Sequence, residues 1–306
     1  MKPHFTILIC SRNDSVAQVQ RSLQVALSQD YDSFRVKWRD DCSDLPDARA
    51  AAFLLDDDRL DATGSERREY AMKHYVELIR EAETEHPGTI ILCHGGDDCL
   101  AGPHALARIA KEYESGAWFT YGQYRQFPSN KVGRCVPIPP EVLTERRVRS
   151  HPFVTMHPTT FYAKLFLKIR EEDLKINGRW IDTAADTHYH FPILEMCGKP
   201  ERVRLIEEIL YYYQEADPKR FVAEEYALQC FMHWNSRHLP RYKTLETLDS
   251  EAEIEPGDSS DWGLICESKK KIYDAKLARV EGEPAVSPDP LTVPSEVPTD
   301  GTGGSQ

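Results

Sequence analysis

The chain has 306 residues, enough for one large α/β domain or two small ones. Hydrophobic residues make up 41% and charged residues 29%, the balance of a globular protein with a full core. The net charge of −12 argues against unaided binding of nucleic acid. No apolar run approaches the roughly 20 residues of a transmembrane helix.

Eight cysteines are scattered along the chain without a C-x-x-C pair. This spacing disfavours a zinc ribbon or a disulfide scaffold and favours a reducing compartment. The first residues lack the basic start and apolar stretch of a secretory signal, so we expect a cytoplasmic location.

Acidic residues are concentrated near the C-terminal end. From Asp249 onward there are 13 acidic and 5 basic residues, which accounts for −8 of the net charge, and residues 284–300 carry five prolines. Such a composition buries too little apolar area to offset chain entropy. We therefore predict a single folded domain over residues 1–245 and a disordered acidic, proline-rich tail over 246–306. Apolar residues at helical spacing predict one short helix within 261–280.

The domain alternates strand and helix patterns in chain order. Residues 5–10 form an apolar run typical of a strand buried on both faces, and residues 16–27 have helical spacing. Strands are predicted at 34–38 and 89–93, with a helix over 66–84 between them. This order predicts an α/β domain with a mostly parallel sheet and helices on both faces.

The second half of the domain is less regular. Residues 118–124 predict a strand, 163–169 a short helix and 202–214 a final strand whose tyrosines we interpret mainly as core packing. Residues 128–150 show no clear period, so we expect a mobile flap there. We interpret the acidic run 56–58 as a solvated loop.

Two acidic pairs follow predicted strands, where ligands bind in parallel sheets. Asp97 and Asp98 come directly after Gly95 and Gly96. Adjacent carboxylates suit Mg²⁺ or Mn²⁺, which take phosphate oxygens as further ligands, and the glycines allow a close approach. An Asp-rich turn that caps the next helix is the alternative explanation.

The other acidic pair, Asp40-Asp41, ends the strand at 34–38. A carboxylate there can accept the imide N–H of a uracil ring. Turn and helix-cap chemistry is again the alternative.

Four motifs in this order resemble family-2 glycosyltransferases of the GT-A fold. They are the strand end Ser11-Arg12-Asn13-Asp14, the run Leu27-Ser28-Gln29-Asp30-Tyr31, the strand end Asp40-Asp41-Cys42-Ser43, and Gly95-Gly96-Asp97-Asp98-Cys99-Leu100 followed by Pro103-His104-Ala105-Leu106. Three positions depart from the family. Gly95 replaces the first Asp of the metal motif, as in some members resembling the spore-coat enzyme, Cys42 replaces a glycine, and Arg12 replaces a tyrosine that stacks on the base. An arginine plane can also stack on a base.

The resemblance implies a Rossmann-like GT-A domain with a nucleotide-binding half over about 1–115 and an acceptor half over about 116–245. It implies that Asp97 and Asp98 hold Mn²⁺ or Mg²⁺ as the cofactor. The residues it assigns to nucleotide binding are Ser11, Arg12, Asn13, Asp40, Asp41, Arg68, Gly96 and Asp97.

The resemblance also implies a catalytic base at Asp186, in Ala185-Asp186 at the start of a helix. A carboxylate at a helix start is kept ionised by the helix dipole and can take the proton of an attacking hydroxyl. Asp182 is the alternative base. Candidate acceptor contacts, or a third metal ligand, are His157, His188 and His190. The rings of His188 and His190 would point about 200° apart on a helix, which disfavours a shared metal.

We therefore expect an inverting glycosyltransferase that moves a sugar from a nucleotide-diphosphate donor, UDP-linked, to the hydroxyl of a glycan or another acceptor. The alternative is a catalytically inactive GT-A-like domain that binds a glycan or a partner protein. Gly95 supports this alternative, as does Gln214, which stands where the family often has arginine.

Overall fold

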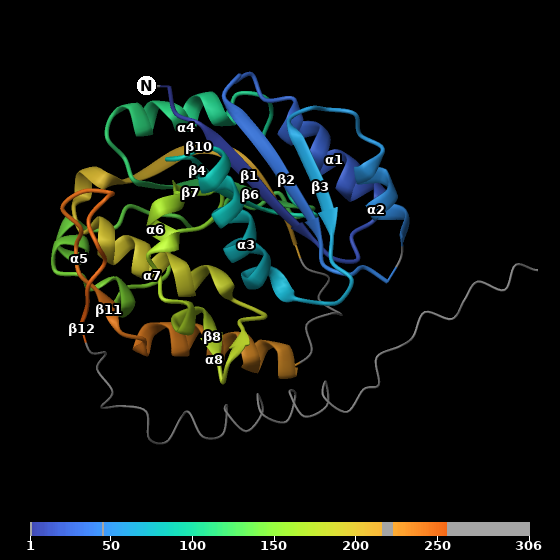
Figure 1. Ribbon diagram of the computed structural model, residues 1–306. Coiled ribbons are helices and arrows are strands. Elements are labelled where there is room, and N and C mark those ends of the chain that lie inside the picture. The colour runs from blue at the N-terminus through green and yellow to red at the C-terminus, as the bar shows by residue number, and fades with distance from the viewer. Residues whose placement is uncertain (1, 45, 216–222, 256–306) are drawn as a thin grey trace, which may run out of the picture.

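The computed structural model of the protein describes residues 2–44, 46–215 and 223–255 (Figure 1). The helix predicted within 261–280 and the proline-rich stretch lie outside these residues. In the described part of the chain, no helix is both long and apolar enough to cross a membrane. Its seven cysteines are all free.

An eight-stranded sheet forms the centre of the domain, with the strand order β3-β2-β1-β4-β7-β6-β10-β5. Its strands are β1 (Phe5–Ser11), β2 (Phe34–Asp40), β3 (Leu60–Gly64), β4 (Ile90–Gly95), β5 (Cys99–Leu100), β6 (Phe119–Phe127), β7 (Thr159–Tyr162) and β10 (Val203–Gln214). β7 is antiparallel to both of its neighbours and β5 is antiparallel to β10, whereas the remaining neighbours are parallel. The predicted mostly parallel α/β sheet is confirmed.

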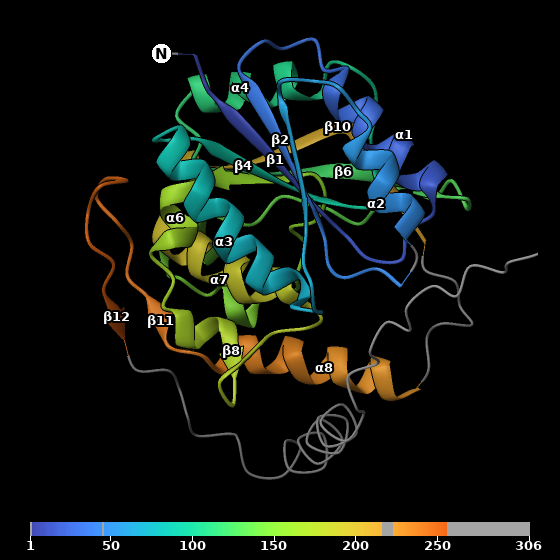
Figure 2. The same cartoon turned by 45° about the vertical axis from the view of Figure 1, so that its right-hand side comes forward.

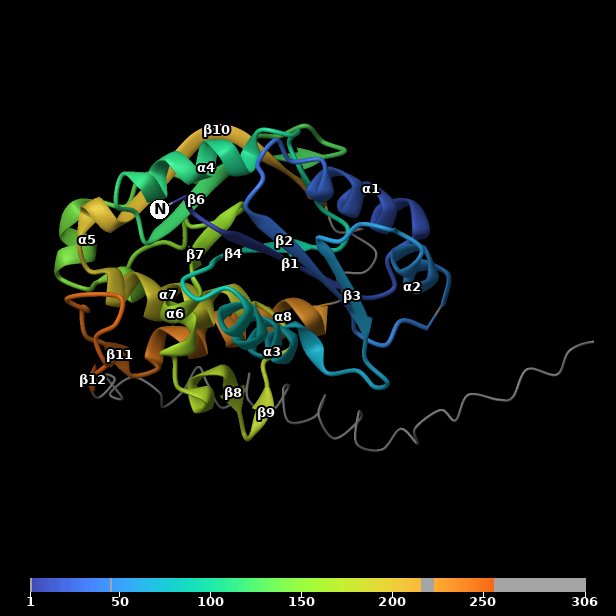
Figure 3. The same cartoon turned by 45° about the horizontal axis from the view of Figure 1, so that its top comes forward.

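Helices cover both faces of this sheet. α1 (Val16–Leu27) and α4 (Ala105–Glu114) lie on one side, and α3 (Tyr70–Glu85), α6 (Ala163–Leu167) and α7 (Ala185–Cys197) lie on the other (Figure 3). α8 (Ala223–His238) packs against α7 (Figure 2). Shorter elements complete the fold: α2 (Pro46–Phe53), α5 (Pro140–Thr144), the pair β8 (Lys175–Ile176) and β9 (Arg179–Trp180), and the pair β11 (Arg241–Tyr242) and β12 (Ile254–Glu255).

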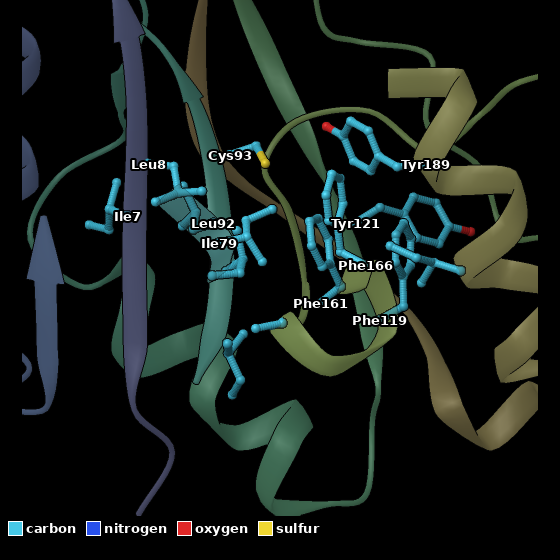
Figure 4. Close-up of a cluster of buried hydrophobic side chains, with 14 of the residues drawn as sticks. Ile7, Leu8, Ile79, Leu92, Cys93, Phe119, Tyr121, Phe161, Phe166 and Tyr189 are labelled. Atoms are coloured by element: carbon cyan, nitrogen blue, oxygen red, sulfur yellow. The ribbon is translucent and has the colours of Figure 1, made fainter. Parts of the chain in front are cut away.

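The central strands are buried on both faces. Ile7 and Leu8 are consecutive in β1, so their side chains point to opposite faces of the sheet, and both are fully buried. On the α6–α7 side, Figure 4 shows a cluster in which Phe161 of β7 lies with Phe166 of α6 and Tyr189 of α7. Burial of each such apolar side chain contributes about 1.5–3 kcal/mol to the stability of the fold, so this cluster helps to fix the central strands in place.

Three elements have no clear pattern in the sequence: α2, β3 and α8. β3 reads Leu-Asp-Ala-Thr-Gly, without an apolar run, because it is an edge strand with no fully buried residue. α3 begins at Tyr70 rather than at residue 66, since the backbone amides of Glu69 and Tyr70 donate to the Asp41 carboxylate.

The prediction of a mobile flap over residues 128–150 is wrong for residues 140–150, which are packed against the domain. α5 buries Val142 and Leu143, and the almost fully buried Arg149 makes a two-pronged ion pair with Glu195 of α7. A buried ion pair leaves no hydrophobic period in the sequence, which is why this anchor escaped prediction.

The ordered chain also continues past the predicted boundary at residue 245. β12 pairs with β11, and the amide of Leu245 donates to the carbonyl of Met196 in α7. Residues 246–255 therefore belong structurally to the domain rather than to a tail.

Candidate functional site

Parallel pairing brings the ends of β1, β2 and β4 to one edge of the sheet. Ser11 lies opposite Asp40, and Cys10 lies opposite Gly95. The residues predicted to bind a nucleotide thus occupy adjacent loops at the carboxyl ends of neighbouring strands, where α/β sheets bind their ligands.

Hydrogen bonds join the loops after β1 and β2. The Asn13 side chain donates to Asp44 over 2.7 Å, and the Asp44 amide donates back to Asn13 Oδ1 over 2.8 Å. Arg12 Nη1 donates to the carbonyl of Asp41 over 2.8 Å. Cys42 has a φ of 54°, a conformation that favours glycine, so the glycine usual in the family at this position has a conformational reason.

Asp40 is fully buried and closes the turn after β2. Its Oδ2 accepts hydrogen bonds of 3.0 Å from the Ser43 amide and from Arg49 Nε. The carboxylate is therefore occupied by protein partners and holds the loop after β2 in shape.

Asp41 binds the start of α3. Its Oδ1 lies 2.6 Å from the Glu69 amide and 2.9 Å from His74 Nε2, and its Oδ2 lies 3.1 Å from the Tyr70 amide. Burial favours the protonated form, but the hydrogen bonds from His74 and from these amides outweigh it and lower the pKa of Asp41. Asp41 thus binds the backbone amides at the start of α3, a contact that was not predicted, and its binding of a nucleotide stays a prediction.

Arg68 lies in the segment just before α3. Its side chain is exposed and stacks on Tyr70, with 4.4 Å between the guanidinium carbon and the ring centroid. Because Asp41 binds the amides of Glu69 and Tyr70, the fold places Arg68 next to the loop after β2.

The two glycines at the end of β4, Gly95 and Gly96, are required by close contacts. A Cβ atom at Gly95 would lie 2.5 Å from Asp98 Oδ2. At Gly96 it would lie 2.9 Å from the Cα of Ser11 and collide with the Asp14 carboxylate. Gly96 therefore permits the approach of the β1 and β4 loops, and Gly95 leaves room for the carboxylate of Asp98.

Asp98 is buried at the end of this turn and is held from β10. Tyr211 donates its hydroxyl to Oδ2 over 2.8 Å, and the Gln214 amide donates to Oδ1 over 2.7 Å. Burial, and then the charge of Asp97, raise the pKa of Asp98 to about 7. Asp97 itself is half-buried, and Arg21 of α1 donates to its backbone carbonyl over 2.8 Å.

The chemistry of these side chains fits a hard divalent cation. Each Asp98 oxygen accepts one hydrogen bond and keeps a second lone pair, and Asp97 adds a second carboxylate. Within the described residues no group of three or more His, Cys, Asp or Glu side chains is arranged to hold a metal. A cation here would take two carboxylates and complete its shell with donor phosphates, which is the usual arrangement for Mg²⁺.

Asp186 stands in the first turn of α7, and its Oδ1 accepts a 3.0 Å hydrogen bond from the Thr187 amide. Burial raises its pKa to about 6. The nearby Tyr213 has a pKa raised to about 12, mainly by burial and further by the charges of Asp98, Asp97 and Asp186. The charges of all three carboxylates thus act on the Tyr213 hydroxyl, so the acid pair and the expected base lie in the same part of the molecule.

The three candidate histidines have different environments. His157 lies in this region, stacked on Tyr211 with 4.9 Å between ring centroids and on Tyr213 with 5.7 Å. His188 is fully buried, and its Nε2 lies 3.1 Å from Asn235 Oδ1 of α8. His190 is buried as well, with its Nδ1 3.1 Å from Thr155 Oγ1.

His188 and His190 are therefore buried in the core, which argues against the contact with acceptor or metal predicted for them. Their rings face different partners, as the helical spacing indicated. Asp182, the alternative base, lies in the loop between β9 and α7.

Sequence reasoning missed three residues of the site. His74 is the side-chain partner of Asp41, Tyr211 holds Asp98, and Tyr75 of α3 packs edge-on against Tyr189. The burial of Tyr75 and the nearby charges of Asp186 and Asp98 raise its pKa well above the usual value. The alternation Tyr211-x-Tyr213 was a usable signal, because residues two apart on a strand share one face.

No family model and no curated protein matches this chain. Solved structures do. Residues 1–349 of S. aureus TarS in complex with UDP-GlcNAc superpose with a TM-score of 0.54 and 16% identity, over 76% of this chain and 66% of that chain. Full TarS gives 0.52 and 14% identity, over 75% of this chain and 39% of that one. The chain has a GT-A type fold.

At 14–16% identity the structural similarity establishes the GT-A type fold, and any reaction has to be inferred from the residues of the site. The chain spans about two fifths of the full TarS chain. The mannosyltransferase PcManGT from Pyrobaculum calidifontis, in complex with GDP-Man and Mn²⁺, gives a lower TM-score of 0.48 at 17% identity, over 78% of this chain and 64% of that one.

Proposed function

We propose that this GT-A type domain is an inverting glycosyltransferase that moves a sugar from a UDP-linked donor to an acceptor hydroxyl. The observation that carries the proposal is that the ends of β1, β2 and β4 align at one edge of the sheet, where β10 holds Asp98. The charges of Asp97, Asp98 and Asp186 all act on Tyr213 of β10, which supports a single site. The complex of TarS with UDP-GlcNAc supports a UDP-linked donor.

The proposed nucleotide site lies in the loops after β1 and β2. Arg12 donates to the carbonyls of Asp41 and Cys42, and the plane of the guanidinium that this turn holds is proposed to stack on the base. Ser11 and Gly96 form the close approach that brings the diphosphate towards the acid pair. Asn13, Asp40 and Asp41 hold these loops in place.

Asp97 and Asp98 are the residues proposed to hold Mn²⁺ or Mg²⁺. Such a cation neutralises the charge that develops on a departing diphosphate.

Asp186 is the proposed base. Its carboxylate takes the proton of the acceptor hydroxyl while the acceptor oxygen forms a bond to the anomeric carbon. The bond between that carbon and the phosphate oxygen breaks, and its electron pair leaves with the nucleoside diphosphate. Attack from the side opposite the leaving group inverts the anomeric carbon. A pKa near 6 makes Asp186 a stronger base than an exposed aspartate, while it stays mostly ionised at neutral pH.

A second candidate function is a GT-A type domain that binds a glycan or a partner protein without transfer. It is favoured by the carboxylates themselves, because Asp40, Asp41 and Asp98 each already accept hydrogen bonds from protein partners. Gly95 also leaves the acid turn one carboxylate short of the family motif.

The two functions are separated by a donor screen with UDP-, GDP- and TDP-sugars, scored by slow hydrolysis without acceptor. Transfer predicts Mn²⁺-dependent hydrolysis of a UDP-sugar by the natural chain. Asp186→Asn should abolish acceptor-dependent transfer, since the amide cannot take a proton.

Asp182→Asn is the matched control, because it makes the same change in the loop before α7. Its transfer rate should stay near that of the natural chain. Full turnover by Asp186→Asn would remove this residue from the mechanism, and calorimetry without Mn²⁺-dependent UDP binding would favour the binding module.

A further inference from the structure

Tyr211 contacts both ends of the acid turn. It is fully buried in β10, where it pairs with Tyr124 of β6 on one side and with Leu100 of β5 on the other. Its hydroxyl donates to Asp98 Oδ2 over 2.8 Å and accepts the Gly95 amide over 3.1 Å. One oxygen atom thus joins the backbone at the end of β4 to the side chain of the second aspartate.

The surroundings keep that hydroxyl in place. His157 stacks on the Tyr211 ring with an interplanar angle of 12°, and His94 packs edge-on against it. The Gln214 amide, three residues further along β10, binds the other oxygen of Asp98. Both oxygens of the Asp98 carboxylate therefore accept a hydrogen bond from β10, which orients the side chain.

The arrangement of Tyr211 and Asp98 depends on the absence of a side chain at Gly95. A Cβ atom there would lie 2.5 Å from Asp98 Oδ2, so the carboxylate occupies space that a larger residue would need. The hydroxyl of Tyr211 contacts both Gly95 and Asp98 at this place.

We propose that Tyr211 is a positioning residue, which acts through Asp98 and sets where this carboxylate meets a divalent cation. The inference rests on the proposed function, because it assigns Asp98 to the cation. Side chains that hydrogen-bond to a metal-ligating carboxylate typically change metal affinity or activity by about 10–100-fold when removed.

The test compares Tyr211→Phe with Tyr121→Phe. Tyr121 of β6 is an equally buried tyrosine whose hydroxyl also makes two hydrogen bonds, donating to the Val136 carbonyl over 2.8 Å and accepting the Ile138 amide over 3.1 Å. The two variants therefore lose the same chemical group and similar stability, but only the first touches the acid turn.

Calorimetry with UDP and MnCl₂ is the first measurement. Tyr211→Phe should weaken Mn²⁺-dependent UDP binding by about tenfold or more, whereas Tyr121→Phe should bind as the natural chain does. Binding to Tyr211→Phe equal to that of Tyr121→Phe would overturn the inference.

Hydrogen exchange of the peptide covering residues 94–98 is the second measurement, and it needs no ligand. Loss of the Tyr211 hydroxyl should speed exchange in this peptide, while Tyr121→Phe leaves it unchanged. If the natural chain binds no UDP with Mn²⁺, the proposed function fails. Faster exchange in Tyr211→Phe then still supports the positioning of the turn, and unchanged exchange overturns it.

Discussion

At the level of single residues, the environment of Asp186 determines the pH range in which it can accept a proton. Burial raises its pKa to about 6, so the ionised form is lost as the pH falls through 6. At saturating Mn²⁺, which would keep Asp98 ionised when bound there, kcat/KM should fall about tenfold per pH unit below 6. A profile that stays flat down to pH 5 would contradict the role of Asp186.

The same raised pKa has a consequence for stability. A buried carboxylate with a raised pKa destabilises the folded state where it is ionised, so its favourable contribution is complete below pH 4 and is lost as the pH rises through 6. Asp186→Asn should therefore raise the Tm at pH 8 and leave it nearly unchanged at pH 4. Scanning calorimetry at the two pH values measures this difference and shows that lost transfer is not lost folding.

At the level of elements, the ion pair between Arg149 and Glu195 anchors the segment before β7 to α7. Arg149 also donates to the carbonyl of Ser236 in the last turn of α8, over 2.6 Å, and to those of Leu239 and Pro240 just after it, over 3.1 Å and 3.0 Å. The guanidinium thus joins three parts of the chain that have no common hydrophobic pattern.

Arg149→Met should lower the free energy of unfolding by about 3–5 kcal/mol, because it leaves Glu195 buried and unpaired. The double variant with Glu195→Met should recover much of that loss. Arg147→Met is the control: the pair it breaks with Glu145 is more than half exposed on both sides, and such pairs contribute about 1 kcal/mol or less. Urea denaturation compares the variants, and equal losses for Arg147→Met and Arg149→Met would refute the anchoring role.

For the whole molecule, the site is assembled from both halves of the domain. The loops after β1, β2 and β4 come from the first half, whereas α7 and β10 come from the second. A ligand bound between them stabilises the folded state by mass action, about 2.7 kcal/mol at a concentration of 100 Kd. For a domain of this size that corresponds to a rise in Tm of roughly 5–10 °C.

UDP with Mn²⁺ should therefore raise the Tm, and UDP with EDTA should raise it less. Asp97→Asn should reduce the effect of Mn²⁺, since it removes one of the two expected carboxylate ligands. An equal rise in Tm with and without Mn²⁺ would show that nucleotide binding does not depend on a cation held by Asp97 and Asp98.

Much of the first half was predictable because its signals are local. An apolar run as in β1 predicts a strand buried on both faces, and α1 spans the predicted range because Ser15 and Gln18 cap its start reciprocally. The loops after parallel strands then follow from the topology. β3 and α2 escaped because an edge strand and a half-exposed helix need little hydrophobic pattern.

The amino-acid sequence by itself determined five strands of the sheet, the first helices between them and the loops that carry the acidic pairs, because burial and capping act over a few residues. Only the tertiary structure decided what each carboxylate binds. Asp41 is directed to the start of α3, Asp98 to β10, and His188 to α8, in each case by a partner far along the chain. Such partners are invisible in a linear pattern, because a buried polar group is satisfied by whatever donor the fold brings within about 3 Å.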